Sequence, residues 1–464
     1  MYQFDLAIIG CGPTGEKAAA QAAYFGKSVV IFEKAPAPGG AGVQTGTLPS
    51  KTLREAAMYL SGYRNRELYG VAVELNPDAT VSKLLARTDA IREGEAKRMI
   101  ENLERHKVNY RNEFAEIVDP HTVRGVGTGE EVTAEFILIA TGSTPFHPPG
   151  VNFPSTEIHD TDEILSIEHL PKSLTIIGAG VIGCEYACMF SALGTRVTII
   201  DKSPSVLTFL DREIVDRLRQ SMERAGVTFM LQTDWQSIEE TSEGIRTTVT
   251  DATGEHAVVN DELLFAAGRS GQLDGLGLDR VGLVPNSRGQ LQVNEDYATQ
   301  VPSILAAGDV VGFPALAATS MEQGRVAVCR AFGFEYKQTV SSLLPYGIYT
   351  IPEVSAVGET EQSAQEKGID YVCGRALYET NARGLITGDR EGITKLLVDR
   401  STHKLIGVHV IGERATELVH IGQAALACGA EIELFIDMVF NYPTLSESYK
   451  YAAYDALQHL QASQ

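Results

Sequence analysis

Cysteine is scarce in this chain, and the six residues present form no recognisable set. They stand far apart or inside an apolar helical pattern: Cys11, Cys184, Cys188, Cys329, Cys373 and Cys428. Their spacing matches neither a zinc site nor the disulfide framework of a small secreted protein, and the ten histidines show no metal spacing. We therefore expect no metal site, and we expect the cysteines to be buried as small apolar side chains.

Basic residues are also few. The chain has 39 lysines and arginines against 60 aspartates and glutamates, a net charge of −21. With no basic excess and no Lys/Arg run, we expect neither nucleic acid nor a membrane surface as a partner. No apolar run approaches the ~20 residues that cross a bilayer. Met1 leads almost at once into an apolar strand without a basic leader, which predicts a cytoplasmic protein.

What the chain does have is a dinucleotide fingerprint near its start. Residues 4–9 are apolar enough for a buried parallel strand, a helix is expected over 16–25, and a second strand over 29–32. The turn between strand and helix carries three glycines, Gly10, Gly12 and Gly15. At this spacing the first glycine allows the tight turn and the second lets the backbone approach a pyrophosphate. The third allows the helix to pack closely against the strand. Glu33 follows at the distance from which a carboxylate accepts a ribose hydroxyl.

A second copy of the fingerprint follows later in the chain. Strands are expected over 174–177 and 196–200, and the glycines between them are Gly178, Gly180 and Gly183. Two fingerprints predict two dinucleotides, which for a redox enzyme are FAD first and NAD(P) second. Asp201 favours NAD(H), because its carboxylate bonds a 2′-hydroxyl and repels a 2′-phosphate. Lys202 and Arg196 could offset that repulsion, so both nucleotides are expected to bind.

Three further strands end in small residues, at the edge of a parallel sheet where ligands bind. The residues expected to contact cofactor there are Thr141, Gly142, Gly268, Arg269, Gly308 and Asp309. A helix is expected over 82–106. Beyond residue 338 no third fingerprint occurs, and the pattern predicts a separate α+β domain with strands over 393–398 and 405–410 and helices over 412–428 and 446–461.

The segment 39–51, which reads GGAGVQTGTLPSK, resembles the active-site segment of the flavoprotein disulfide reductases. That family has Gly-Gly, two cysteines five residues apart, and then Pro-Ser-Lys. Here Gly42 and Thr47 stand at the cysteine positions. The family's His-Pro-Thr-x-x-Glu segment is matched by residues 442–447, YPTLSE, with tyrosine in place of histidine. With this tyrosine the chain resembles the transhydrogenase members of the family. Those members keep one cysteine at the position where this chain has Gly42.

The resemblance implies an α/β chain with two Rossmann-like dinucleotide-binding domains and a C-terminal α+β dimerisation domain that makes a homodimer. The implied bounds are FAD-binding 1–148 and 273–338, NAD(P)-binding 149–272 and interface 339–464. It further implies catalytic roles for Lys51, Glu185, Thr47, Tyr442 and Glu447, the last two beside the partner's site. The implied cofactor contacts also include Lys34, Gly40, Thr45, Gly46, Lys51 and Lys202.

The missing groups all belong to one half of the family's reaction. Gly42 and Thr47 can form neither disulfide nor thiolate, and Tyr442 has a reference pKa near ~10, which makes it a poor proton shuttle at neutral pH. The other half is complete, since the resemblance places Lys51 and Glu185 as an ion pair beside flavin N5, where a cation stabilises developing charge. We therefore expect a ping-pong transhydrogenase in which NADPH reduces FAD and NAD⁺ then takes the hydride.

Two alternatives stay open. One is an NAD(P)H reductase of quinones or other small acceptors, because Gly42 leaves space beside the flavin. The other is a flavin-bound redox sensor without fast turnover, against which the intact pair of Lys51 and Glu185 argues.

Overall fold

The first sheet is built around the first fingerprint. In the computed structural model, which describes residues 2–62 and 77–462, its strand order is β3-β2-β1-β6-β5-β4, with β17 beside β6. The bounds are β1 Phe4–Ile9, β2 Val29–Phe32, β3 Asn109–Arg111, β4 Ala115–Asp119, β5 Thr122–Gly125, β6 Glu131–Ile139 and β17 Ile304–Ala306. β1 pairs in parallel with both β2 and β6, so its carboxyl end lies at the centre of the sheet edge.

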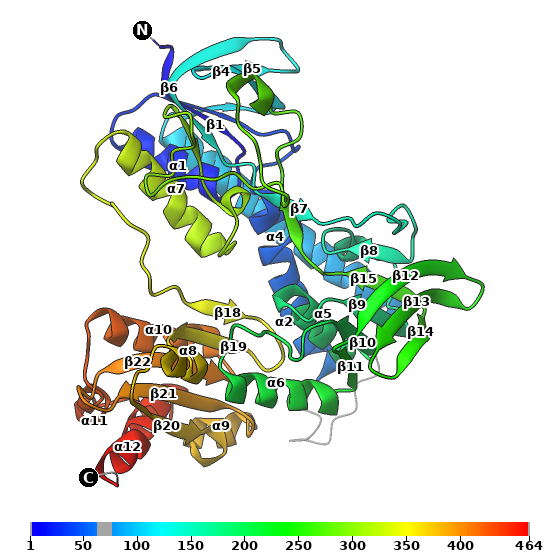
Figure 1. Cartoon of the computed structure of the whole chain (residues 1–464), viewed down its shortest axis with the longest axis vertical. Coiled ribbons are helices and arrows are strands. Elements are labelled where there is room, and N and C mark those ends of the chain that lie inside the picture. The colour runs from blue at the N-terminus through cyan, green and yellow to red at the C-terminus, as the bar shows by residue number, and fades with distance from the viewer. Residues whose placement is uncertain (1, 63–76, 463–464) are drawn as a thin grey trace.

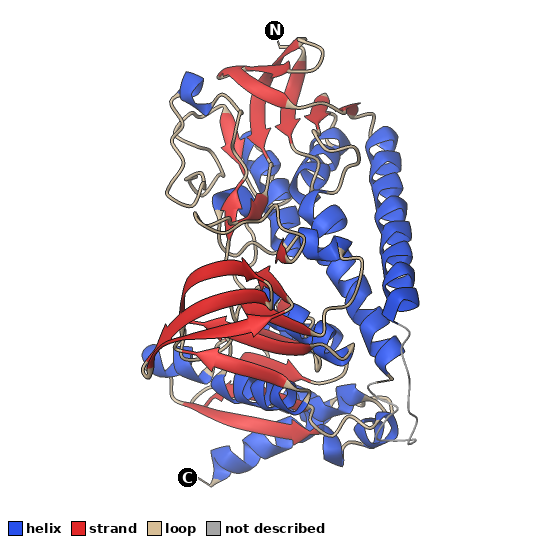
Figure 2. Ribbon diagram, turned by 90° about the vertical axis from the view of Figure 1, so that its right-hand side faces the viewer, coloured by secondary structure: helices blue, strands red, loops and turns tan. Residues whose placement is uncertain are grey.

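Three helices cover one face of this sheet: α1 Pro13–Tyr24, α4 Pro77–Arg105 and α7 Ala317–Ala331. Apolar side chains of β1 and β2 pack between them, and Figure 1 shows α1 and α7 side by side in the upper half of the molecule. The helix expected over 82–106 is present as α4, which starts five residues earlier and stands along one side of the molecule in Figure 2. Within the described residues no helix combines the length and apolarity needed to span a bilayer.

The second sheet is the parallel core of the second fingerprint, with strand order β11-β10-β9-β15-β8. Helices α5 Val181–Ala192 and α6 Arg212–Arg224 cover one face. An antiparallel sheet of β12, β13 and β14, which the sequence patterns did not predict, covers the other. The strands are β8 Ile158–Asp160, β9 Ser173–Ile177, β10 Arg196–Asp201, β11 Val227–Leu231, β12 Asp234–Thr241, β13 Gly244–Asp251, β14 Gly254–Asn260 and β15 Glu262–Phe265.

The third sheet is antiparallel, in the order β18-β19-β22-β21-β20, and lies at the C-terminal end of the molecule (Figure 1). Its strands are β18 Tyr346–Ile348, β19 Val354–Gly358, β20 Tyr371–Leu377, β21 Ile393–Asp399 and β22 Leu405–Ile411. The helices of this region are α8 Glu361–Glu366, α9 Ala382–Thr387, α10 Ala415–Ala427, α11 Glu433–Asp437 and α12 Ser448–Gln461. α10 and α12 pack their apolar faces against the sheet.

Three expectations for this region need correction. The helix expected from residue 412 starts at Ala415, because Arg414 before it has a φ of 60° and lies outside the helical region. The helix expected from 446 starts at Ser448, after a short 3₁₀ turn over Leu445–Glu447. The expectation of buried cysteines is wrong for Cys428, which is exposed just after α10, whereas the other five are buried and all six are free.

Candidate functional site

The first glycine turn leaves no room for a side chain at Gly10 or at Gly15. Gly10 has a φ of +104°, and a Cβ there would overlap the carbonyl of Ala140, just after β6. A Cβ on Gly15 would overlap the carbonyl oxygen of Gly10, so α1 can approach β1 this closely only with glycine. Glu33 is buried at the end of β2, and its carboxylate accepts the backbone N–H of Cys11 at 2.9 Å and of Ala35 at 2.8 Å. A carboxylate has about four acceptor positions, so capacity for a ribose hydroxyl is left.

A cavity of about 290 Å³ extends from this turn along the edge of the first sheet. The expected cofactor residues that line it are Gly10, Gly12, Glu33, Lys34, Gly40, Thr45, Thr141, Gly142 and Asp309. Thr141 carries a buried hydroxyl with no hydrogen-bond partner among the described residues, as expected of a group that faces a polar ligand. These features fit the flavin dinucleotide that the first fingerprint predicts. Gly308 lies just behind, with a φ of +84° and Thr14 where a Cβ would go.

Two hydroxyl groups donate hydrogen bonds to the carboxylate of Asp309 and orient it at this cavity. Ser143 Oγ donates to one carboxylate oxygen at 2.9 Å, and Ser320 Oγ donates to the other at 3.1 Å. Ser143 lies between the first two sheets and Ser320 lies on α7, so the orientation of Asp309 depends on segments far apart in sequence. Two hydrogen bonds leave further acceptor positions for a polyol.

The second glycine turn repeats the first. Gly178 has a φ of +113°, and a Cβ on Gly183 would overlap the carbonyl oxygen of Gly178. Asp201 accepts the backbone N–H of Ala179 at 2.7 Å through one oxygen and of Ser203 at 2.7 Å through the other. Its position therefore matches that of Glu33 in the first fold. Gly180 caps α5, Lys202 follows β10, and Gly268, with a φ of +121°, lies between β15 and the next strand.

Lys51 and Glu185 meet across the boundary between the first two sheets. Lys51 lies on α2 Thr47–Ser61 and Glu185 on α5, and Lys51 Nζ is 2.6 Å from Glu185 Oε2. The carboxylate is buried, whereas the lysine side chain is 24% exposed and lines a cavity. The sequence expectation of an ion pair between these two residues agrees with this geometry.

Tyr349 completes this arrangement, and the sequence patterns did not point to it. Its backbone N–H donates to Glu185 Oε1 at 2.8 Å, and Lys51 Nζ lies 4.9 Å from the centre of its ring. Burial raises the pKa of the Tyr349 phenol, so the ring is neutral. The residue follows β18 in the third sheet, and only the folded chain brings it beside α2 and α5. The pair is therefore fixed by three structural units.

A second cavity, of about 510 Å³, opens at this pair. Lys51, Glu185, Tyr349 and Arg269 line it, together with residues of the first turn of α5. It shares lining residues with the first cavity: Ala41, Thr45, Thr47, Asp162, Asp309, Ala315 and Ala317. The two cavities thus adjoin, and Lys51 stands beside the place where they meet.

The positions of the missing thiols lie beside this junction. Residues Ala41–Thr45 form a single π-helical turn against the start of α1, and a Cβ on Gly42 would lie 2.6 Å from Pro13 Cγ. A side chain at 42 would therefore require Pro13 or the turn to shift. Thr47 is exposed and lines both cavities. Burial raises the pKa of the Cys11 thiol and raises that of Cys188 to about 12, so neither is a ready nucleophile.

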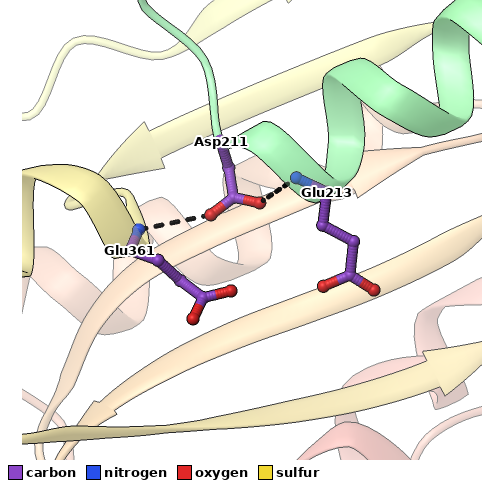
Figure 3. A group of neighbouring side chains, drawn as sticks. All are labelled: Asp211, Glu213 and Glu361. Carbon is purple, nitrogen blue, oxygen red and sulfur yellow. Dashed lines mark hydrogen bonds between the residues drawn. The ribbon is translucent and has the colours of Figure 1, made fainter.

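Three carboxylates also gather away from the cavities, where α6 meets the third sheet: Asp211, Glu213 and Glu361 (Figure 3). Asp211 accepts the backbone N–H groups of Glu213 and Glu361 at 3.1 and 3.2 Å. Lys395 on β21 has no exposed side-chain surface, and its Nζ lies 2.8 Å from Asp211 and 3.1 Å from Glu213 and bonds Glu361. The group is therefore an ion-pair cluster between two domains.

Tyr442 and Glu447 lie apart from both cavities of their own chain, in and after the loop that leads to α12. The Tyr442 side chain is 73% exposed. The structure thus brings Lys51, Glu185 and Thr47 together and leaves these two residues on the surface of the third region. Their expected role beside a partner's site stays a prediction.

Comparison with known proteins agrees with this architecture. Residues 4–324 match the pyridine nucleotide-disulphide oxidoreductase family, and residues 344–453 match the dimerisation domain of that family. A protein named soluble pyridine nucleotide transhydrogenase from Mycobacterium tuberculosis (strain ATCC 25177 / H37Ra) is 44% identical over 466 residues, covering 100% of this chain and 99% of that protein. A protein of the same name from Chromohalobacter salexigens is 38% identical and covers 99% of both.

Solved structures show the same fold along nearly the whole chain. LpdA from Mycobacterium tuberculosis superposes with a TM-score of 0.88 at 26% identity, over 97% of this chain and 98% of that one. The HOCl-induced flavoprotein disulfide reductase RclA from Escherichia coli gives a TM-score of 0.85 at 26% identity, over 96% and 98%.

Proposed function

Because the chain belongs to the pyridine nucleotide-disulphide oxidoreductase family, we propose that it is an NAD(P)⁺ transhydrogenase that exchanges hydride between NADPH and NAD⁺. Proteins of this family bind FAD and use NAD(P)H, and the chain is a flavin-dependent oxidoreductase of that kind. Relatives that match it from end to end are named soluble pyridine nucleotide transhydrogenase. When bound, FAD would take hydride from one nicotinamide and return it to another.

One observation carries the proposal. The pair of Lys51 and Glu185 is intact at the junction of the two cavities, whereas no cysteine lies at positions 42 and 47. A lysine held at such a junction places positive charge where negative charge develops during hydride transfer. Glu185 keeps that ammonium in place and is itself fixed by the Tyr349 amide. Without thiols to serve, a second nicotinamide in the same cavity is the simplest acceptor.

The nucleotide preference follows from Asp201. Its carboxylate is fixed by two backbone N–H groups, so it cannot swing away from a 2′-phosphate without losing both bonds. The negative charge of this carboxylate repels the 2′-phosphate of NADPH, whereas the carboxylate can accept a hydrogen bond from the 2′-hydroxyl of NADH. We infer that both nucleotides bind and that NAD(H) binds more tightly. Competition titrations with the two oxidised nucleotides would measure the ratio, and tighter binding of NADP⁺ would contradict the inference.

We also infer a homodimer in which Tyr442 and Glu447 reach the partner's cavity. The match to a dimerisation domain supports it, as do exposed apolar side chains in this region: Leu434, Met438, Val439, Tyr442, Tyr451 and Tyr454. Light scattering of the purified protein at several concentrations would test it, and a monomer at all of them would contradict it. The cytoplasmic location expected from the sequence stays a prediction.

The decisive experiment is anaerobic. The purified flavoprotein is mixed with NADPH until the flavin absorbance is bleached, excess nucleotide is removed, and NAD⁺ is added. Prompt return of the absorbance with formation of NADH is the expected result. Bleaching that persists until a quinone is added would favour the small-acceptor reductase instead. If neither NADPH nor NADH bleaches the flavin, the result would favour the flavin-bound redox sensor without fast turnover.

A further inference from the structure

Two short strands carry the chain between the first two sheets. β7 Ser143–Pro145 follows β6 on the way to β8, and β16 Arg269–Gly271 follows β15 on the way back to β17. The strands pair with each other in antiparallel register, with Arg269 opposite Pro145 and Gly271 opposite Ser143. We call this pair of strands the hinge ribbon. Any movement of one dinucleotide-binding sheet relative to the other must bend it.

Arg269 ties the hinge ribbon together with a single guanidinium. Its Nε donates to Ser143 Oγ at 2.9 Å, and Nη2 donates to the Ser143 carbonyl at 2.8 Å. Its Nη1 lies 3.3 Å from both Thr161 Oγ1 and Asp162 Oδ1, just beyond β8. Arginine presents several donors in one rigid plane, so this side chain fixes three backbone segments at once.

The same contacts connect the two cavities. Ser143, which accepts from Arg269, donates to Asp309 in the first cavity, and Asp162, which pairs with Arg269, lines both cavities. Both charged side chains are mostly shielded, at 20% and 24% exposure, so the pair is screened less than a surface ion pair. Burial raises the pKa of the Asp162 carboxyl, and Arg269 opposes that shift. A continuous polar chain therefore runs Asp309–Ser143–Arg269–Asp162.

We propose that Arg269 and Asp162 are a positioning pair that sets the separation of the two dinucleotide-binding sheets, and thereby the alignment of nicotinamide and flavin. The inference rests on the proposed function. Hydride transfer requires reacting atoms about 3–3.5 Å apart, and a misplacement of about 1 Å can cost on the order of 100-fold in rate. Neither residue has to touch the reacting atoms, because the ribbon transmits their effect through the backbone.

The kinetic test uses four variants and a matched control. We expect R269M to lower the limiting rate of flavin reduction by NADPH at least about 10-fold while the half-saturating NADPH concentration changes less than about 3-fold. D162N should lower the rate about 3-fold, and the double variant should match R269M, because the two act as one unit. R269K should recover part of the rate. R219Q, which breaks a surface pair with Glu223 on α6, should match the parent protein.

A second measurement is independent of turnover. Hydrogen–deuterium exchange of the FAD-loaded protein without nicotinamide nucleotide should be at least about 10-fold faster in peptides that contain the hinge ribbon in R269M, with β10 unchanged and R219Q like the parent. Unchanged exchange in the ribbon would overturn the proposal, as would a loss of rate that only follows a loss of bound FAD. If neither nucleotide reduces the parent flavoprotein, the proposed function fails, and the exchange data still decide whether the pair holds the ribbon.

Discussion

Two lysines in this molecule are paired across domain boundaries, and they are built for different purposes. Lys51 faces one carboxylate and an aromatic ring, keeps a quarter of its surface exposed and opens onto a cavity. Lys395 faces three carboxylates and is wholly enclosed. The difference teaches how a positive charge is kept available. The Lys51 side chain is partly exposed at a cavity, so its charge can interact with a bound ligand. The Lys395 side chain is enclosed, so its charge interacts only with neighbouring protein groups.

The strength of each pairing follows from its surroundings. Removing Lys395 would leave the buried carboxylate of Asp211 without its counter-charge, and the loss of one partner of a buried ion pair typically costs about 3–5 kcal/mol. The pair of Lys51 and Glu185 is exposed on its lysine side, so it is screened more than the wholly enclosed Lys395 and contributes less to stability. The comparison therefore predicts that Lys395 governs stability with little effect on turnover, and that Lys51 governs turnover with little effect on stability.

The largest expected effect is on folding. We expect K395M to lower the free energy of unfolding by about 3–5 kcal/mol, because Asp211, Glu213 and Glu361 would lose their shared cation. Urea denaturation of the FAD-free protein measures this. K367M, which breaks the exposed pair with Glu359, is the control and should change stability by less than about 1 kcal/mol. A K395M protein as stable as the control would break the comparison.

The same cluster predicts a pH dependence. Burial opposes the charged forms of Asp211 and Glu361, but other effects hold both pKa values below their ordinary 3.8 and 4.5. For Asp211 these are the charges of His409 and Lys395 together with hydrogen bonds, and for Glu361 the hydrogen bond and the charge of Lys395. Carboxylates shifted in this direction add stability that is present above those values and lost as the pH falls through the folded pKa. The difference in free energy of unfolding between the parent protein and K395M should therefore be largest near neutral pH and should become smaller below about pH 4. A gap that widens in acid would contradict this sign.

The next effect is on rate. We expect K51M to slow flavin reduction by NADPH about 100-fold, since it removes the cation at the junction of the cavities. Its unfolding free energy should change by less than half as much as in K395M. Stopped-flow absorbance with matched FAD content gives the rate, and K367M again serves as control. Loss of stability without loss of rate in K51M would reverse the assigned roles.

A smaller effect tests the neighbouring π-helical turn. We expect G42C to destabilise the protein by about 1–3 kcal/mol, because its Cβ would lie 2.6 Å from Pro13 Cγ. T47C should be close to neutral, since Thr47 is exposed. Thermal unfolding compares the two, and the added change P13A should relieve G42C. If G42C is as stable as T47C, the turn adapts more readily than its packing indicates.

The smallest effect concerns the aromatic ring beside Lys51. Y349F keeps the ring and the backbone N–H that bonds Glu185, so its rate should equal that of the parent. Y349L removes the ring and its cation–π contact, worth about 0.5–1 kcal/mol at a partly exposed site, and should slow flavin reduction about 2- to 5-fold. A strong effect in Y349F would instead assign a role to the phenol hydroxyl.

Sequence patterns predicted the structure best where it depends on residues close together in the chain. Strand, glycine turn and helix follow one another within thirty residues, and the glycine positions are dictated by contacts inside that unit, such as Gly15 against Gly10. The acids that end β2 and β10 lie where the spacing placed them, each bonded to the backbone of its own glycine turn. The antiparallel sheet β12–β14 escaped prediction, because its strands are largely polar on their outer face and paired only with each other.

The sequence by itself thus determined the two dinucleotide folds, the loss of the thiols and the identity of the lysine and glutamate, since each depends on residue types at short spacing. Only the tertiary structure decided that the Tyr349 backbone N–H binds Glu185 from 164 positions away, that Lys395 pairs with three acids, and that Arg269 joins the hinge ribbon to Asp162. These contacts depend on how three sheets pack against one another, and packing between distant segments leaves no periodic trace in the chain.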